Sequence, residues 1–489
     1  MSNIKKFEWS SDAEEDRFEV ENPATGELIV VIQGGGPTEV DAAVRRANDV
    51  FTNDWRWRPG AERGRLLIQA AQVIREHSAE IAAIETRENG KPLGQAMGDV
   101  AGCIAILEYF GGLAGKLPGD FHVNGPMLGA AFLEPYGVVG SIVPFNWPPI
   151  HTAGKIAPAI AAGNTVVIKP PEQTPMTVIR VVELIQSVLP QGVVEIVPGV
   201  GLRAGAALAE HPLIKLISFT GATVTGAAVV RAGADNSTPV LLELGGKNAM
   251  VVFEDADLDL AVKSAFDGAF FNQGEACTAI SRLLVHRSLH DEFVRRLTPL
   301  VEELRVGPGD DPQTQVGPMV TKRHQGTVLR HLDRALSEGA VIAAQAVAPD
   351  DEAAAFVAPT MLVGVTPDMS VARDEVFGPV LAVIPFDDEA EAIAITNDTE
   401  YGLTCSIFSS DQPRAFRVSR SVDVGMVFIN NYFRGGVFGL PFGGTKGSGH
   451  GREHTIETLK EYGRWKVLSM PSGLGQWPMW PDVPALLRD

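Results

Sequence analysis

Cysteine is scarce in this chain of 489 residues, which contains only Cys103, Cys277 and Cys405. Three scattered cysteines are too few for a disulfide framework or a cysteine-rich metal site, so we expect free thiols in a reducing compartment and no bound metal. The sequence also lacks any run of about 18 uninterrupted apolar residues, and its N-terminal stretch MSNIKKFEWSSDAEEDRFEV has no apolar core like that of a signal peptide. We therefore expect a cytoplasmic protein with no membrane partner.

Positive charge is also in short supply. The 41 lysines and arginines face 60 aspartates and glutamates, which leaves a net charge of −19. This balance argues against nucleic acid or anionic membranes as partners and favours solubility. The chain is longer than one hydrophobic core usually serves, so we expect at least two domains.

Segments of helical spacing alternate with short apolar runs along most of the chain, which indicates an α/β fold. The clearest series is GVVGSIVPFN, IHTAGKIAPAIAAG, NTVVIKP, TPMTVIRVVELIQSVL, GVVEIVPG, LRAGAALAEH, LIKLISFTG and TVTGAAVVRAGA, read alternately as strand and helix. Gly163 should end the first of these helices, and Thr174 and Pro175 should begin the second as N-cap and first helical residue. This alternation is typical of nucleotide-binding domains.

A second α/β series begins after about residue 246 with NAMVVFE, DLDLAVKSAFDGAFF, SRLLVH and SLHDEFVRRLTPLVEEL. A domain boundary near residue 245 is therefore expected. Three segments do not fit either series: the Gly-rich stretch 117–135, the short apolar strand candidate 462–470, and a tail with Trp477, Trp480 and several prolines. These segments could form arms between domains or subunits.

Cys277, in the stretch FFNQGEACTAISR, is the cysteine whose surroundings suggest chemistry. Gly274 and the polar residues before it predict a loop or helix start, where main-chain N–H groups can lower the pKa of a thiol and later hold an oxyanion. The alternative is a buried, unreactive cysteine, which is the commoner finding. Cys103 lies in the continuous helical face VAGCIAILEYF, and Cys405 lies in the strand-like YGLTCSIF, so both are expected in the core.

A nucleophilic thiol needs partners that stabilise an oxyanion and resolve the covalent intermediate. Glu243, between a strand-like run and a glycine pair in LLELGGKN, could activate water, and Asn146 in PFNWPP could donate to an oxyanion. Taken singly, Glu243 could equally be a solvated strand end and Asn146 a turn former.

The phosphate-binding signal is not a GxGxxG fingerprint. In SFTGATVTG, Gly221 and Gly226 bracket a helix start directly after a strand, where N–H donors and the helix dipole favour a pyrophosphate. Lys169 and Glu172 in IKPPEQTP follow another strand, and a carboxylate there can accept hydrogen bonds from ribose hydroxyls. Taken alone, the second pair could be an ordinary charged loop.

Read together and in order, PFNWPP, IKPPEQTP, FTGATVTG, LELGGKN, NQGEACTAISR, DEVFGPV and PFGGTKGSGHGRE resemble the motif series of the NAD(P)-dependent aldehyde dehydrogenase superfamily. The resemblance spans about residues 18–470 and includes the 34 positions from Glu243 to Cys277. It implies a Rossmann-type nucleotide-binding domain, an α/β catalytic domain and a small β oligomerisation arm. We assign these to residues 1–116 with 136–245, residues 246–446, and residues 117–135 with 462–489, the last range including the tail.

The resemblance also implies roles. Cys277 is the expected nucleophile, Asn146 with the Cys277 N–H the oxyanion hole, and Glu243 the base that hydrolyses the thioester. The positions implied to bind the cofactor are Lys169, Glu172, Phe145, Gly221, Gly226, Glu375 and Phe377. Since Glu172 would repel a 2′-phosphate, we expect NAD rather than NADP.

Three positions depart from the commonest family pattern: Ala222 replaces a frequent Ser, Phe145 a frequent Trp, and Glu275 a common Gln. Ala222 and Phe145 should at most weaken cofactor binding. A carboxylate at Glu275 would raise the pKa of the thiol if it pointed inward, and would have no effect if it pointed outward.

By position, the substrate tunnel would be lined by Trp147, His151, Phe271, Ala276, Thr278 and the loop 430–440, which contains Arg434 and Phe438. This lining favours an apolar or aromatic aldehyde. Arg434 could instead pair with a semialdehyde carboxylate, or be a solvated loop residue. Because Glu243 is present, water rather than coenzyme A or phosphate should accept the acyl group; a non-catalytic relative is the remaining alternative. We expect a homodimer or homotetramer.

Overall fold

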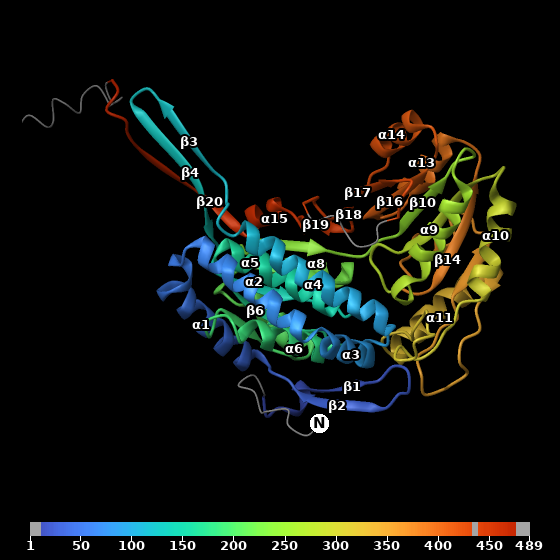
Figure 1. Ribbon diagram of the computed structural model, residues 1–489, viewed down its shortest axis with the longest axis horizontal. Helices are drawn as coiled ribbons and strands as arrows, with labels where there is room; N and C mark the ends of the chain where they lie inside the picture. The colour runs from blue at the N-terminus through green and yellow to red at the C-terminus, as the bar shows by residue number, and fades with distance from the viewer. Residues whose placement is uncertain (1–10, 433–438, 476–489) are drawn as a thin grey trace, which may run out of the picture.

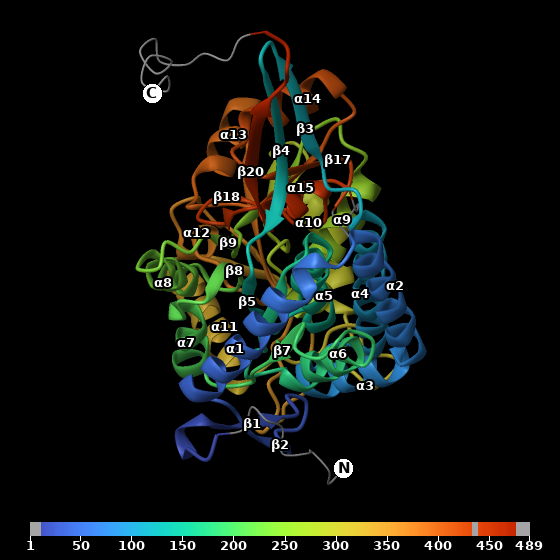
Figure 2. The ribbon, with the colours of Figure 1, turned by 90° about the vertical axis from the view of Figure 1, so that its left-hand side faces the viewer.

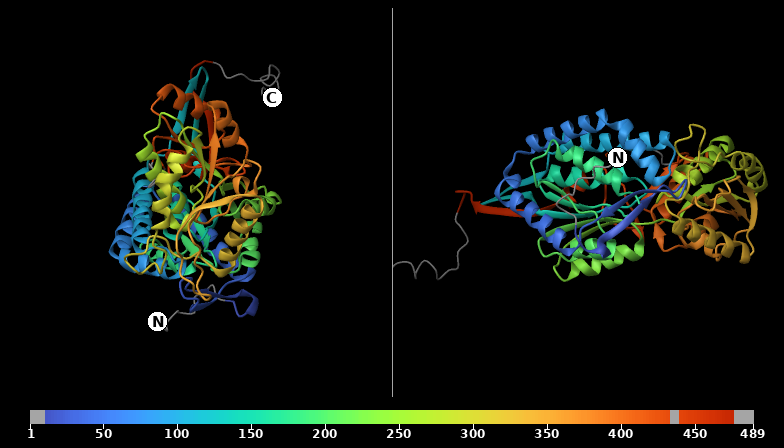
Figure 3. Two further views of the ribbon diagram at one scale, coloured as in Figure 1. Left: turned by 90° about the vertical axis from the view of Figure 1, so that its right-hand side faces the viewer. Right: turned by 90° about the horizontal axis from the view of Figure 1, so that it is seen from below.

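The computed structural model describes residues 11–432 and 439–475, and these contain two large, mainly parallel sheets, a separate three-stranded sheet and two two-stranded sheets (Figure 1). In Figure 1 the first sheet and its helices occupy the left half, the second sheet and its helices the right half, and the small sheet projects away at the upper left. The view from below in Figure 3 gives the same order of arm, first half and second half. The α/β architecture expected from the alternating pattern is confirmed.

The first sheet has six strands, in the order β19 (Gly449–His450), β9 (Val240–Glu243), β8 (Ile214–Thr220), β5 (Val138–Ile142), β6 (Thr165–Lys169) and β7 (Val194–Ile196). Strands β5 to β9 are parallel and β19 pairs antiparallel with β9. Helices α1 (Pro37–Asn53), α7 (Ala206–Glu210) and α8 (Thr223–Ala234) lie on one side in Figure 2, and α2 (Gly60–Glu76), α4 (Leu93–Leu113) and α6 (Pro175–Gln186) on the other. The remaining helices of this half are α3 (Ser78–Asn89) and α5 (Pro148–Ala162).

Gly163 ends α5 as predicted, in the left-handed conformation with φ of 98°. Thr174 precedes Pro175 at the start of α6, but its side chain makes no capping bond there. The buried Glu88 carboxylate of α3 accepts the Met176 and Thr177 N–H groups instead, at 2.8 and 2.7 Å. Thr174 therefore occupies the predicted N-cap position and Pro175 the first helical position, while a buried anion from another helix satisfies the first N–H donors.

Helix α4 is long and apolar enough, by length and composition, to cross a membrane, and it is the one such helix among the described residues. Half of that stretch is buried in the protein, where Cys103, Leu107 and Phe110 are fully buried in the core that α4 shares with α2 and α5. A core helix of a soluble protein passes the same test. The cytoplasmic location stays a prediction.

The second sheet has seven strands, in the order β12 (Val341–Gln345), β13 (Thr360–Val363), β14 (Val380–Phe386), β11 (Ile280–His286), β10 (Asn248–Val252), β16 (Thr404–Phe408) and β17 (Met426–Ile429). All neighbours are parallel except β12 and β13. The helices of this half are α9 (Leu258–Phe270), α10 (His290–Glu302), α11 (Lys322–Ser337), α12 (Ser370–Arg373), α13 (Glu389–Asn397) and α14 (Gln412–Ser421). The chain changes sheet between β9 and β10; the domain boundaries themselves stay a prediction.

The small sheet is β3 (Gly119–Asn124), β4 (Met127–Pro135) and β20 (Gly463–Pro471), with β4 in the centre and both pairs antiparallel. It combines the two strand-like segments that fitted neither α/β series. The remaining short elements are the hairpin β1 (Arg17–Glu21) and β2 (Leu28–Gln33), the pair β15 (Tyr401–Gly402) and β18 (Thr445–Lys446), and helix α15 (Ile456–Glu461).

Candidate active site

Cys277 lies on a turn between the short helix η4 (Phe271–Gly274) and β11, and it is partly exposed, whereas Cys103 and Cys405 are buried. Only glycine fits at position 274 of this turn. Gly274 has φ of 71°, and a Cβ there would lie 2.4 Å from the Gly378 carbonyl oxygen. Asn248 Nδ2 donates to the Cys277 carbonyl oxygen at 2.7 Å. The thiol is therefore on a rigid loop.

Burial raises the pKa of the Cys277 thiol above its ordinary value, and the nearby carboxyl groups of Glu243, Glu375 and Glu453 raise it further. The resting thiol is thus protonated at neutral pH. A nucleophilic role needs a base that removes this proton.

Glu243 is the last residue of β9 and is 6% exposed. Neither of its carboxyl oxygens has a hydrogen-bond partner among the described residues. Burial raises the pKa of Glu243 well above its ordinary value, Glu453 adds to this, and Lys155 opposes it. A carboxyl group without partners and with a raised pKa is a stronger base than an ordinary carboxylate.

Glu453 and Lys155 form a buried ion pair beside Glu243, with Nζ and Oε1 2.7 Å apart. Burial alone would raise the pKa of Glu453, but Lys155 lowers it below its ordinary value. Sequence reasoning missed both residues. The signals that could have drawn attention to them are a lysine inside the apolar helix segment 148–162 and the acid that ends the glycine-rich motif PFGGTKGSGHGRE.

Asn146 follows β5 and is 3% exposed, and its Oδ1 has no partner within the described chain. Asn272 Nδ2 donates to the main-chain oxygens of Asn146 at 3.2 Å and of Glu275 at 2.9 Å. Because Glu275 is two residues before Cys277, this side chain joins the predicted oxyanion amide to the loop that carries the thiol.

A cavity of about 860 Å³ reaches Cys277. Apolar and aromatic side chains dominate its lining, which includes Trp147, His151, Phe271 and Thr278 as predicted, together with Leu93, Met97, Ile106, Ile150, Tyr432 and Phe442. The predicted Ala276 lines a separate small pocket behind the Cys277 turn. Arg434 and Phe438 lie outside the described residues.

His151 packs its ring 6.2 Å from that of Trp147 at this cavity. Burial lowers the pKa of His151 to about 3, so the imidazole is neutral. Among the described lining residues the charged side chains are acidic: Asp99, Asp310, Asp311 and Glu453. Asp99 and Glu453 are each paired with a lysine, which leaves two exposed carboxylates in this lining.

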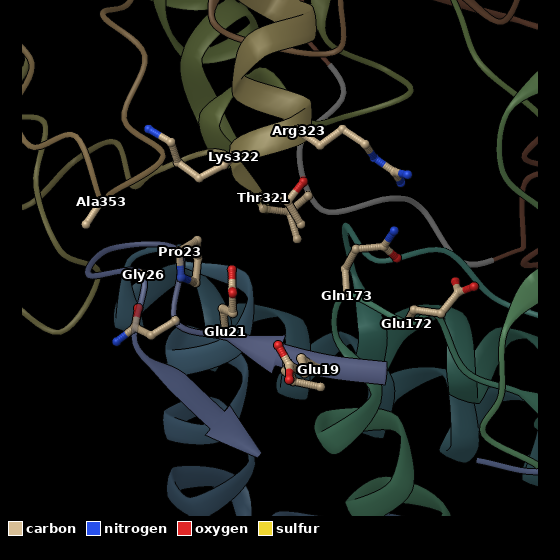
Figure 4. A pocket seen from close by; sticks show the side chains of 13 residues that line it. Glu19, Glu21, Pro23, Gly26, Glu172, Gln173, Thr321, Lys322, Arg323 and Ala353 are labelled. Atoms are coloured by element: carbon tan, nitrogen blue, oxygen red, sulfur yellow. The ribbon is translucent and has the colours of Figure 1, made fainter. Parts of the chain in front are cut away.

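On the predicted cofactor side, Glu172 Oε1 accepts the Gly201 N–H at 2.7 Å, and Lys169 Nζ lies 3.7 Å from the other oxygen of Glu172. Glu172 and Gln173 face a second pocket of about 200 Å³ between the β1 hairpin and the start of α11 (Figure 4). In Figure 4, Glu19 and Glu21 point into the same pocket from β1. This pocket is separate from the lining of the Cys277 cavity.

The two predicted phosphate-loop glycines differ in their surroundings. Gly221 follows β8, and the next residue, Ala222, occupies the N-cap of α8 with no side-chain cap bond. The first-turn N–H groups of α8 therefore have no competing side-chain cap, which fits an anion. Gly226 is buried in α8, where a Cβ would lie 2.8 Å from Leu244 Cδ2, so close packing explains this glycine.

The predicted residues of the nicotinamide side lie near the Cys277 loop. Glu375 Oε1 accepts the Gly246 N–H at 2.8 Å, and burial raises the pKa of Glu375 to about 7. The rings of Phe145 and Phe377 meet edge to face at 5.8 Å, and Phe377 has a positive φ of 54°. His324 Nε2, 2.7 Å from the Phe377 carbonyl oxygen, holds this strained residue.

Comparison with known proteins gives one consistent result. The model of the aldehyde dehydrogenase family matches residues 9–468. The chain is 47% identical over 480 residues to aldehyde dehydrogenase citD of Monascus ruber, covering 98% of this chain and 95% of that protein. It is 39% identical to human retinaldehyde dehydrogenase 3, covering 95% and 92%. The structure of betaine aldehyde dehydrogenase from Staphylococcus aureus in complex with NAD+ superposes with a TM-score of 0.93 at 35% identity, covering 97% and 95%.

Proposed function

Because the chain belongs to the aldehyde dehydrogenase family, we propose that it oxidises an aldehyde to a carboxylic acid with NAD as the hydride acceptor. The observation that carries this proposal is that a thiol in the wall of a large cavity has an amide and a carboxyl group near it. Cys277 lies in the cavity wall, the oxyanion candidate Asn146 is tied to its loop by Asn272, and the unpartnered Glu243 acts on its pKa.

The cofactor fits the residues present. Bound NAD supplies the acceptor for the hydride that leaves the substrate. Lys169 and Glu172 would hold the adenosine ribose, the uncapped start of α8 the pyrophosphate, and Glu375 the second ribose, with Phe377 beside it. Support comes from the NAD+ complex of the similar Staphylococcus aureus enzyme.

In the first step the Cys277 sulfur attacks the aldehyde carbon as Glu243 takes the thiol proton, because the raised pKa of the thiol keeps it protonated at rest. The carbonyl oxygen becomes the oxyanion of a thiohemiacetal. The Asn146 amide donates to this oxygen, since the loop holds it rigidly beside the turn. Loss of hydride leaves a thioester on Cys277.

Glu243 first releases the thiol proton to solvent. It then takes a proton from water as the water oxygen attacks the thioester carbon, and it passes that proton to the departing Cys277 sulfur, which releases the acid and restores the thiol. The Lys155–Glu453 ion pair lies beside Glu243, and the charge of Lys155 favours the ionised form of Glu243. The ion pair therefore adjusts the pKa of Glu243. Coenzyme A or phosphate as acceptor is the alternative, and the presence of Glu243 favours water.

The wall composition and the cavity volume of about 860 Å³ favour a bulky apolar or aromatic aldehyde. Exposed Asp310 and Asp311, both in the described lining, disfavour an anionic one. The alternative of a carboxylated semialdehyde depends on Arg434. If Arg434→Ala lowers kcat/KM for succinic semialdehyde but not for a neutral aldehyde, the semialdehyde alternative takes precedence.

The decisive test is pre-steady-state NADH formation from NAD and an aromatic aldehyde without coenzyme A or phosphate. Cys277→Ala should abolish it. The Glu243→Gln variant should remove the thiol proton more slowly. Its reaction should then stop after one NADH per site, because water is no longer activated to attack the thioester. A steady rate equal to wild type in Glu243→Gln would exclude it as the base.

NAD should be preferred over NADP because the Glu172 carboxylate would repel a 2′-phosphate. Glu172→Gln should raise kcat/KM with NADP more than with NAD. Equal efficiency of the wild-type enzyme with both cofactors would contradict this assignment.

We also propose that the protein is a homodimer or homotetramer held by the arm of β3, β4 and β20. Its strands carry exposed apolar side chains, including Phe121 at 66%, Trp465 at 50% and Val467 at 73% exposure. A projecting apolar sheet of this kind is unfavourable in water unless a partner covers it.

A further inference from the structure

The main-chain oxygen of Asn146 is held by a buried lysine that the reaction itself does not use. Lys91 is 0% exposed, and its Nζ donates to the Asn146 oxygen at 2.7 Å. The neutral amide of Asn272 makes the second, longer bond at 3.2 Å. A hydrogen bond from an ammonium group is roughly twice as strong as one between neutral groups. Lys91 is therefore the main anchor of this oxygen.

Two carboxyl groups keep Lys91 in place. Asp99 Oδ2 accepts a hydrogen bond from Nζ at 2.5 Å, and Glu85 Oε1 lies 2.8 Å from it. An ammonium group has three N–H donors, and three oxygens lie within this distance of Nζ when Asn146 is included. Nζ donates hydrogen bonds to Asp99 and Asn146 and forms an ion pair with Glu85, so its position is fixed from three sides and the buried charge is compensated.

The main-chain carbonyl group that precedes Asn146 is also held by buried hydrogen-bond donors. The Phe145 oxygen accepts from Asn89 Nδ2 at 3.0 Å and from Thr174 Oγ1 at 3.3 Å, and both donors are fully buried. The backbone is thus pinned on both sides of Asn146. In contrast, Oδ1 of its side chain has no partner among the residues described.

We infer that Lys91 is a positioning residue, which holds the Asn146 backbone so that the side-chain amide points at the oxygen of the Cys277 adduct. This rests on the proposed function. Asp99 belongs to both the lysine cluster and the wall of the substrate cavity, so the cavity wall and the oxyanion amide share one rigid support. A misplacement of about 1 Å in such a site can reduce the rate about 100-fold.

The test compares two reactions of the same thiol. Aldehyde oxidation passes through an oxyanion, whereas alkylation of Cys277 by iodoacetamide does not. Lys91→Met alone would leave the Asp99 carboxylate buried and unpaired and could fail to fold, so the main variant is Lys91→Met/Asp99→Asn, which removes both of these charges. Burial raises the pKa of the remaining Glu85 well above its ordinary value, so this group favours its neutral form. We expect kcat/KM for an aromatic aldehyde to fall about 10- to 100-fold, with alkylation rate and NAD affinity within about twofold of wild type.

Ile81→Val is the matched control, since Ile81 is equally buried on α3 but lies outside the Lys91 cluster; it should keep wild-type oxidation. In an Asn146→Ala background the double substitution should cause no further loss, because the amide that Lys91 positions is gone. Parallel losses of oxidation and alkylation, an undiminished rate, or full additivity with Asn146→Ala would each overturn the inference. If the wild-type enzyme oxidises no aldehyde, the proposed function fails first.

Discussion

Replacement of Glu275 by glutamine should make the protein more stable at alkaline pH. Glu275 is 0% exposed; the Val320 N–H donates to its Oε1 at 3.0 Å, and its Oε2 has no partner in the described chain. Burial raises the pKa of Glu275 from 4.5 to about 8. Below pH 4.5 both folded and unfolded chains are protonated here, so the group contributes no pH dependence there.

Between pH 4.5 and about pH 8, Glu275 of the folded chain keeps a proton that the unfolded chain has lost. The free energy of unfolding therefore falls as pH rises. At about 1.4 kcal/mol per pH unit, the loss between pH 5 and pH 8 is about 3–4 kcal/mol. Glu275→Gln is neutral throughout and escapes this loss. Its stability relative to wild type should therefore rise with pH and level off above about pH 8.

Urea unfolding of both proteins at pH 5, 6, 7 and 8 measures this difference. Glu302→Gln, at an exposed position of α10, is the control for the change in net charge. A difference between Glu275→Gln and wild type that is independent of pH would refute the buried, protonated carboxyl group. Glu275 also has no effect on the thiol. Its carboxyl group accepts from the Val320 N–H and is neutral at pH 7, so Glu275 does not raise the pKa of Cys277.

Three further predictions concern other parts of the protein. Gly98 lies on the α4 wall of the cavity with open space around its Cβ position, so Gly98→Leu should reduce kcat/KM for bulky aldehydes about tenfold but spare propanal in steady-state assays. Lys155→Met should raise the pKa of Glu243 and move the acidic limb of the pH–rate profile upward by about 1–3 pH units; an unmoved limb would contradict the tuning role. Val467→Asp on the arm should lower the mass measured by light scattering to that of a monomer, whereas Val347→Asp, equally apolar and 84% exposed but outside the arm, should not.

Local sequence signals predicted the elements that hold the site. Helix α8 spans Thr223–Ala234, the segment marked by its spacing, and Gly163 ends α5 through its left-handed conformation. Such features depend on neighbouring residues, which a single sequence contains. The loop position of Cys277 was likewise evident from Gly274 and the polar residues before it.

Contacts between distant residues could not be predicted in this way. Lys91 and Asn146 are 55 positions apart, and Lys155 and Glu453 are 298 positions apart. Neither pair has a periodicity that links its members, because each arises from packing between different elements. The start of α6 shows both effects: local propensity correctly placed Thr174 at the N-cap, but the acceptor of the first N–H groups is Glu88 of a different helix.

The antiparallel pairing of β19 with β9 has a consequence for the biosynthesis of the enzyme. Gly449 pairs with Glu243 itself, so the edge of the strand that carries the proposed base is covered by residues translated more than 200 positions later. A nascent chain that has already folded its first five parallel strands presents β9 as an open edge, which is open to association with other chains until the last segment emerges. Since β20 also completes the arm only at that stage, activity and assembly both wait for the C-terminal end of translation. Prematurely terminated chains should therefore be inactive and prone to aggregate, which removes them from the pool of competent subunits.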